Sequence, residues 1–129
     1  EDCIVIGADT VVACDQEILG KPADDQDAFR MLHMLQGRTH EVYTGVAILS
    51  YNNAGEKEII NHAVETKVHV HEMSEEEIRA YIATGDPMDK AGAYGIQGSF
   101  AAYIDGIEGD YYNVVGLPVS YVYQCLKKY

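Results

Sequence analysis

At 129 residues, 47% of them hydrophobic, the chain is long enough for one domain, residues 1–129, that buries roughly two-thirds of its unfolded surface. A net charge of −12 with only nine lysine and arginine residues argues against a protein that binds a nucleic-acid backbone. Such proteins gain affinity when their basic side chains replace the cations condensed on the phosphates. No apolar run approaches the roughly 20 residues of a membrane span, and nothing resembles an export leader, so we expect a cytoplasmic protein without a membrane partner.

The cysteines fit that expectation. Cys3, Cys14 and Cys125 are odd in number and lack metal-type spacing, so we interpret them as core thiols in a reducing compartment, with a zinc or disulfide role left open. An acidic protein can still bind a small anion. Such a site needs local positive charge, amide donors or a divalent cation held by carboxylates.

The first elements in chain order are strands. The run Cys3–Ala8 is short, apolar and rich in β-branched residues, which predicts a strand buried on both faces. Segments 10–14 and 17–19 predict a short hairpin about Asp15-Gln16. Asp9 therefore falls where the first strand is expected to end.

A helix and two long strands follow. Apolar residues recur at helical spacing between Ala28 and Leu35, with Asp24 or Asp25 as cap and Gly37 just past the end. Segments 41–51 and 59–71 predict two antiparallel strands, the second alternating between an apolar and a wet face.

The rest of the chain mixes helix and loop. Ser74 and Glu77 predict a capping box for a helix that runs to about Ala83. Residues 85–98 are glycine-rich and aperiodic, hence loop; 99–105 is expected to be strand, 105–110 a turn, and the last segment a helix with Pro118 in its first turn. The order predicts an α/β fold with a mixed β-sheet and flanking helices.

Asp9 is the first candidate for chemistry. Ligands in open α/β sheets bind beyond the carboxyl ends of strands, where a carboxylate can bind Mg²⁺ or take a proton from water. A capping or turn aspartate is an equally good interpretation of this stretch alone.

Two lysines and a glycine-rich loop suggest phosphate. Lys21 sits between Gly20 and Pro22, and Lys90 precedes the glycines at 92, 95 and 98, a pattern typical of backbone that approaches phosphates. Surface lysines are the simpler reading of each, and no Walker-type spacing is present.

Histidines and tyrosines supply weaker candidates. His69 and His71 face the same way on a strand and could ligate a metal, although solvated imidazoles are the commoner use. Tyr94, Tyr111 and Tyr112 could stack on a base, although core or turn packing is commoner.

Five segments in order give a resemblance to a known family. They are "IGADTVV", "ILGKP", "MLHMLQGRTHEVYTGVAI", "PMDKAGAYGIQG" and "GDYYNVVGLP", and the match as a whole runs from about Ile4 to Ser120. Together they resemble the Maf proteins, named for inhibition of septum formation and known as nucleoside triphosphate pyrophosphatases. The resemblance implies an elongated, two-lobed α/β fold of the Maf/ITPase type, commonly dimeric.

The resemblance also implies site residues. Asp9 would be the catalytic carboxylate, holding Mg²⁺ (or Mn²⁺) or activating the water, and Lys21 and Lys90 would face the triphosphate. Gln97 and Thr10 match the branch that cleaves dTTP and UTP between the α- and β-phosphates, giving a monophosphate and pyrophosphate. A related branch prefers methylated GTP and usually has glutamine at the position of Thr10.

One departure from the family pattern qualifies this. Maf proteins begin with a Ser-x-Arg-Arg loop and supply a glutamate and a further lysine, which this chain lacks. We therefore expect an N-terminal portion to be missing and the chain as given to have little or no activity. The alternative to an enzyme is a Maf-like module that binds nucleotide or a cell-division partner without turnover.

Overall fold

The computed structural model describes residues 4–51 and 54–127. Its strands are β1 (Val5–Cys14), β2 (Glu17–Leu19), β3 (Thr39–Tyr51), β4 (Lys57–Val70) and β5 (Ile104–Glu108). Its α-helices are α1 (Asp25–Leu35), α2 (Glu75–Ile82), α3 (Tyr111–Val115) and α4 (Val119–Leu126). Short 3₁₀ turns occupy Asp86–Asp89, Ala91–Ala93 and Ser99–Tyr103.

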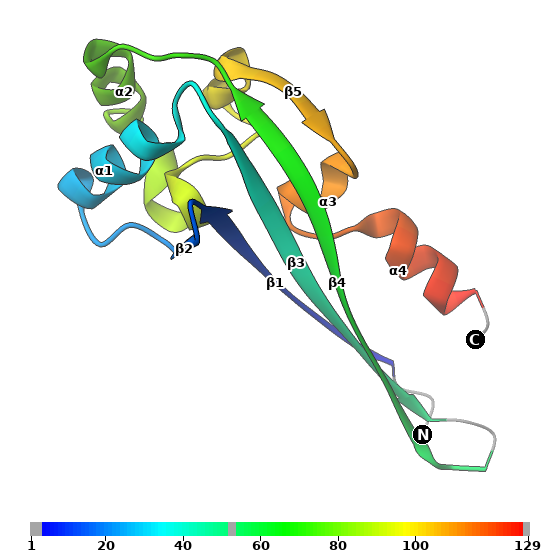
Figure 1. The fold of residues 1–129 in the computed structure, drawn as a ribbon. Coiled ribbons are helices and arrows are strands. Elements are labelled where there is room, and N and C mark those ends of the chain that lie inside the picture. The colour runs from blue at the N-terminus through cyan, green and yellow to red at the C-terminus, as the bar shows by residue number, and fades with distance from the viewer. Residues whose placement is uncertain (1–3, 52–53, 128–129) are drawn as a thin grey trace.

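The strands form one five-stranded sheet in the order β2-β1-β3-β4-β5 (Figure 1). The α/β class with flanking helices is confirmed, but all strand pairings in the described part of the chain are antiparallel, so the expectation of a mixed sheet is wrong. The cause is the position of β1. The crossover through α1 joins β2 to β3, which run the same way, and β1 lies between them with the opposite direction.

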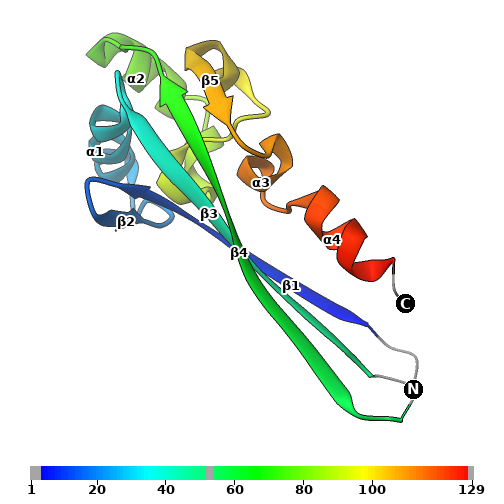
Figure 2. The ribbon, with the colours of Figure 1, turned by 45° about the vertical axis from the view of Figure 1, so that its right-hand side comes forward.

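The molecule has a broad end and a narrow arm. Helices α1 and α2 and the 3₁₀ turns cover one sheet face at the broad end, whereas the long strands β3 and β4 extend with β1 into the arm, along which α4 lies (Figures 1 and 2). Each part has its own apolar cluster. In the arm, Val122 of α4 packs with Val46 and Ile48 of β3, and the larger cluster lies under α1 and α2.

Strand β1 differs from its prediction. It runs unbroken through Asp9, so this residue lies in mid-strand and not at a strand end. Its first half is exposed, with Val5 57% and Ile6 42% accessible, because β2 pairs only with Val12–Cys14 and leaves the rest of β1 at the sheet edge. A short apolar run in the sequence does not distinguish a strand buried on both faces from a strand at the sheet edge. Cys3, the first residue of the predicted strand, lies outside the described residues.

The predicted hairpin turn and the caps of the first two helices are confirmed. Asp15 and Gln16 both have positive φ (51° and 67°), as a two-residue hairpin turn between right-twisted strands requires. Asp24 caps α1 by accepting from the Asp27 amide, and Ser74 with Glu77 forms the capping box of α2.

The segment after residue 98 needs correction. Residues 99–103 form a 3₁₀ turn, and β5 begins only at Ile104 and continues to Glu108, inside the turn predicted for 105–110. Phe100 explains the turn, because its ring enters the core against Tyr81 and Tyr94 instead of alternating across a sheet. Helix α3 was not predicted, whereas α4 starts after Pro118 as expected.

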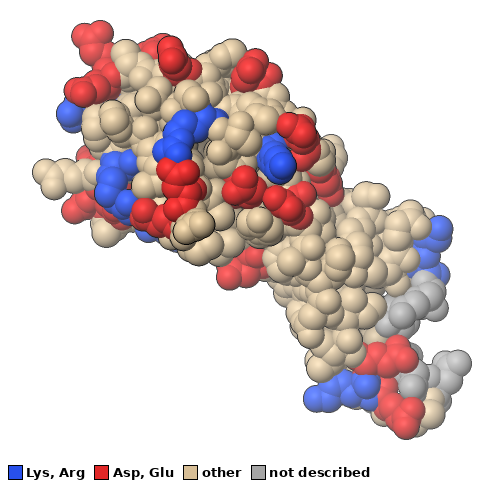
Figure 3. All heavy atoms as spheres, viewed as in Figure 1, with Lys and Arg blue, Asp and Glu red and all other residues tan. Residues whose placement is uncertain are grey.

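Charge is spread over the surface. Acidic and basic side chains interleave over the broad end, and no continuous basic area appears on the face in Figure 3. None of the helices in the described residues is long and apolar enough to cross a membrane. Cys14 is a free buried thiol, as predicted, and burial raises its pKa; Cys125 is free and half-buried.

Candidate functional site

One pocket, of about 760 Å³, collects all five predicted site residues. Asp9 and Thr10 reach it from β1, Lys21 from the loop after β2, and Lys90 and Gln97 from the glycine-rich segment 85–98. The apolar part of its wall is formed by Val11, Val12, Val42, Tyr94, Ile96, Val114 and Val115. A volume of this size suits a nucleotide-sized ligand.

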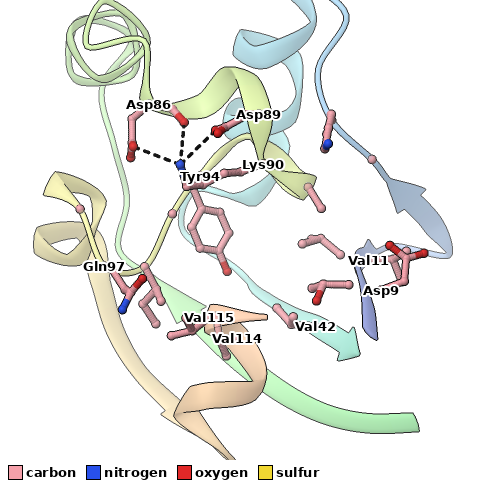
Figure 4. Close-up of a pocket in the computed structure, with 18 residues that line it drawn as sticks. Asp9, Val11, Val42, Asp86, Asp89, Lys90, Tyr94, Gln97, Val114 and Val115 are labelled. Atoms are coloured by element: carbon pink, nitrogen blue, oxygen red, sulfur yellow. Dashed lines mark hydrogen bonds and ion pairs between the residues drawn. The ribbon is translucent and has the colours of Figure 1, made fainter. Parts of the chain in front are cut away.

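Lys90 is held in place by two carboxylates. Its Nζ lies 3.2 Å from Asp86 Oδ1 and 3.1 Å from Asp89 Oδ1, and these hydrogen bonds raise the pKa of Lys90 (Figure 4). Asp86 is fixed in turn by the Tyr81 hydroxyl at 2.6 Å, and Tyr81 accepts from the Gly95 amide at 3.1 Å. The ammonium group is therefore oriented by a chain of hydrogen bonds that ends in the backbone.

The glycines of this segment allow the close packing. A Cβ on Gly95 would lie 2.5 Å from Lys90 Cε, and one on Gly98 would lie 3.0 Å from Asp86 Oδ2. The pattern suggested backbone that approaches phosphate. The structure shows a different immediate reason, because these glycines make room for the pocket's own side chains.

Lys21 faces the pocket from a tethered loop. Its neighbour Gly20 accepts a hydrogen bond from the Gly92 amide at 3.0 Å, which ties the loop to the glycine-rich segment. The Lys21 side chain is exposed and has no partner among the described residues. Its ammonium group is thus available to an anion.

The side chains of Asp9 and Thr10 point to opposite faces of β1, because successive strand residues alternate. Both residues nevertheless line the pocket, since this part of β1 lies at the edge of the sheet. Asp9 pairs in register with Gly45, and a Cβ on Gly45 would meet no atom within 4 Å apart from those of Gly45 and its two chain neighbours. The Asp9 carboxylate is exposed, forms no hydrogen bond or ion pair with any described residue, and lies across the pocket from Lys90 (Figure 4). It therefore has room for a water or a cation.

The hydroxyl of Thr10 has a fixed role in a hydrogen-bond chain. It lies 2.8 Å from the Thr44 hydroxyl, and Thr44 donates to the Asn113 carbonyl at 3.0 Å. Because the hydroxyl hydrogen of Thr44 is already donated to the Asn113 carbonyl, Thr10 must donate to Thr44. The Thr10 oxygen is then left as an acceptor.

Tyr94 forms a buried wall of the pocket. Its hydroxyl lies 2.7 Å from His40 Nε2, and its ring packs against Phe100. Burial, with a smaller contribution from His69, lowers the pKa of His40 to about 4, so this imidazole is neutral at pH 7. Burial likewise raises the pKa of Tyr94, which keeps its hydroxyl protonated.

The other candidates lie outside the pocket. His69 contacts Glu108 and Thr39, both at 2.6 Å, and His71 lies 3.5 Å from Asp105. Within the described residues no three His, Cys, Asp or Glu side chains converge on a possible metal position, so the metal hypothesis for His69 and His71 gains no support. Tyr111 and Tyr112 are exposed and pack edge-to-face against each other.

The pocket's charge bears on the metal question. Three carboxylates (Asp9, Asp86, Asp89) and two ammonium groups (Lys21, Lys90) line it, so a polyphosphate would meet no net positive charge. Mg²⁺ commonly binds through one or two carboxylates together with substrate phosphates, keeping several waters. The open Asp9 carboxylate fits that mode, whereas an all-protein cage is absent from the described residues.

The whole chain, residues 1–129, matches the family described as "Maf-like protein". The chain belongs to the Maf family. Similar curated proteins are named "dTTP/UTP pyrophosphatase": one from Agathobacter rectalis is 57% identical over 99% of this chain and 62% of its own length. Those from Koribacter versatilis (56%; 96% and 62%) and Lachnoclostridium phytofermentans (52%; 98% and 64%) carry the same name. The chain thus spans less than two-thirds of the length of these Maf relatives.

Sequence reasoning missed several residues of this Maf pocket. Asp86, Thr44 and Asn113 orient the predicted residues, and His40 orients Tyr94. Only Asp86 gave a usable signal, since it lies four residues before Lys90 in the same segment. The others come from strands and helices far away in the sequence.

Proposed function

We propose that this pocket binds a pyrimidine nucleoside triphosphate, dTTP or UTP, and hydrolyses it to the monophosphate and pyrophosphate. The observation that carries the proposal is the convergence of Asp9, Thr10, Lys21, Lys90 and Gln97, from separate segments, on one pocket. The names of the Maf relatives support the substrate class.

The chemistry assigns a part to each group. A water oxygen attacks the α-phosphorus and forms the new P–O bond, while the bond from that phosphorus to the α,β-bridging oxygen breaks. Asp9 accepts the proton that the water loses. Lys21 and Lys90 bind the β- and γ-phosphates and stabilise the charge that develops on the departing pyrophosphate.

A divalent cation, Mg²⁺ or Mn²⁺, is part of the proposal. Asp9 would hold it together with the phosphates, and when bound it would neutralise negative charge during the attack. Support comes from the chemistry of the pocket, whose carboxylates outnumber its ammonium groups.

Thr10 and Gln97 are proposed to contact the nucleoside. Both present uncharged hydrogen-bonding groups, and Thr10 offers an acceptor with its own hydrogen already committed to Thr44. Neutral polar groups suit a base, whereas the lysines suit phosphates.

The proposed setting is a cytoplasmic homodimer that acts on a small molecule. The support is the resemblance to a commonly dimeric family and the net charge of −12, which disfavours nucleic acid. Light scattering at several protein concentrations tests the dimer, and a monomer throughout would refute it.

The test of the activity is pyrophosphate release with Mg²⁺ from dTTP, UTP, CTP and methylated GTP. Asp9→Asn should lower the rate by about 10²-fold or more, since it keeps the shape but removes the base and the metal ligand. Asp105→Asn, which neutralises an exposed carboxylate on β5 outside the pocket, is the matched control and should retain activity. Equal rates in the two variants would refute the catalytic role of Asp9. Turnover of methylated GTP alone would refute the assignment of pyrimidine triphosphates as substrates.

A further inference from the structure

The buried pair His40–Tyr94 leaves one nitrogen without a partner. His40 is 0% exposed, its Nε2 lies 2.7 Å from the Tyr94 hydroxyl, and its Nδ1 has no hydrogen-bond partner in the described structure. The rings meet edge to face with centroids 5.4 Å apart. The neutral imidazole carries one hydrogen, and the surroundings decide which nitrogen holds it.

The unpartnered Nδ1 decides the tautomer. If Nδ1 held the hydrogen, a buried N–H would lack an acceptor, which is rarer in proteins than an under-used acceptor. If Nε2 holds it, Nε2 donates to the Tyr94 oxygen, and the hydrogen left without a partner among the described residues is that of the Tyr94 hydroxyl. Tyr94 lines the pocket, where water or a ligand can accept this hydrogen, whereas Nδ1 is enclosed in the core. The second arrangement is favoured.

This tautomer frees the hydrogen of Tyr94. The Tyr94 oxygen accepts from His40, so its own O–H must find another acceptor, and none of the described residues provides one. Tyr94 lines the pocket, and Figure 4 shows its hydroxyl on the side where Val42, Val114 and Val115 lie, away from Asp86 and Asp89. The free donor is therefore at the apolar end of the pocket, which suits a base.

We propose that Tyr94 donates this hydrogen bond to the 4-carbonyl oxygen of uracil or thymine and thereby selects against cytosine, with His40 as the positioning residue. The inference rests on the proposed function. Uracil and thymine share an acceptor at position 4, whereas cytosine presents an amino group there. A donor facing a donor leaves both hydrogens unpaired on burial.

The first test measures affinity, so that it does not depend on turnover. The probes are the α,β-methylene analogues of UTP and CTP with Mg²⁺, titrated by calorimetry against the protein, Tyr94→Phe and Tyr103→Phe. Tyr103 belongs to the same aromatic cluster through Phe100 but does not line the pocket. The protein and Tyr103→Phe should favour the UTP analogue by at least about tenfold, and Tyr94→Phe should lose most of that ratio.

The second test addresses His40 directly. In the ¹⁵N-labelled protein, the His40 ring should show an unprotonated Nδ1 and a protonated Nε2. His40→Gln can still donate from its side-chain amide and should keep more of the selectivity than His40→Leu, which cannot donate. This readout stands even if Tyr94→Phe fails to fold.

The outcomes separate the two proposals. A protonated Nδ1, equal affinity for the two analogues, binding of neither, or full selectivity in a folded Tyr94→Phe would each overturn the role of Tyr94. Selective binding of the UTP analogue without pyrophosphate release from UTP would support the role of Tyr94 and overturn only the proposed hydrolysis.

Discussion

Gly92 lies so close to β1 that a Cβ on it would sit 2.8 Å from Cγ2 of Val12. Its φ of +73° is also one that residues with side chains rarely adopt. The contact joins the segment that carries Lys90 to the strand that carries Asp9 and Thr10. The close contact between Gly92 and Val12, which leaves no room for a side chain at position 92, thus sets how the two halves of the pocket lie relative to each other.

Gly92→Ala should therefore destabilise the fold by about 2–4 kcal/mol, combining backbone strain with overpacking against Val12. Gly85→Ala is the matched control, because Gly85 has a similar φ of +79° but open space around it. It should cost only about 1 kcal/mol. Urea denaturation of both variants measures the difference, and equal losses would show that the Val12 contact contributes nothing.

Gly95→Ala should affect activity more than stability. The three atoms nearest to the new methyl group all belong to the flexible Lys90 side chain, whose Cε lies 2.5 Å away, so the ammonium must move while the fold adjusts at low cost. We expect kcat/KM for UTP to fall by about tenfold or more, with an unfolding free energy within about 1 kcal/mol of the parent. Gly106→Ala, with open space at its Cβ, should change neither quantity, and an unchanged kcat/KM in Gly95→Ala would refute the positioning of Lys90.

His40 should make stability depend on pH below neutrality. Its pKa is about 4 in the folded protein against an ordinary 6.5, so between these values the unfolded chain binds the proton and the folded one does not. The free energy of unfolding should therefore fall as the pH drops from 6.5 towards 4, by about 3 kcal/mol in all, and this contribution should level off below pH 4. His40→Gln removes the effect, so the difference between the two stability curves isolates it. Parallel curves across this range would contradict the buried neutral imidazole.

Asn113 should be the most sensitive polar residue of the sheet. Its Nδ2 donates to the carbonyls of Val42 and Val64, at 3.2 and 2.9 Å, and contacts the Thr66 hydroxyl at 3.1 Å. Asn113→Ala removes the donor from these buried acceptors and loosens α3 from the strands, at a cost of about 2–4 kcal/mol. The exposed Asn61→Ala on β4 should cost under about 1 kcal/mol by thermal unfolding, and a similar loss in both would contradict this role.

Local signals were predicted well and distant contacts were not. The caps at Asp24 and Ser74 and the turn at Asp15-Gln16 depend on residues within a few positions of each other, so the sequence contains their whole cause. The 3₁₀ turn at Phe100 depends on Tyr81 and Tyr94, which only the fold brings near. Apolar content alone could not distinguish that turn from a strand.

The candidate site shows the same division. The resemblance of whole motifs to Maf proteins placed Asp9, Thr10, Lys21, Lys90 and Gln97, and all of them line the pocket. The reasoning that put Asp9 at a strand end was wrong, because it ended the strand with the apolar run at Ala8, whereas β1 continues to Cys14. The hydrogen bonds Thr10–Thr44 and His40–Tyr94 join residues 34 and 54 positions apart, so no short sequence pattern predicts them.

The placement of Asp9 and Thr10 on opposite faces of β1 restricts how this strand can change over time. Substitutions can alter either face separately, but inserting or deleting one residue between Thr10 and the hairpin turn would exchange the faces, turning Asp9 towards the core and Thr10 towards solvent. A change of two residues restores the alternation. Length variation in this part of the chain should therefore come in pairs, or be confined to the turn and loops outside the sheet.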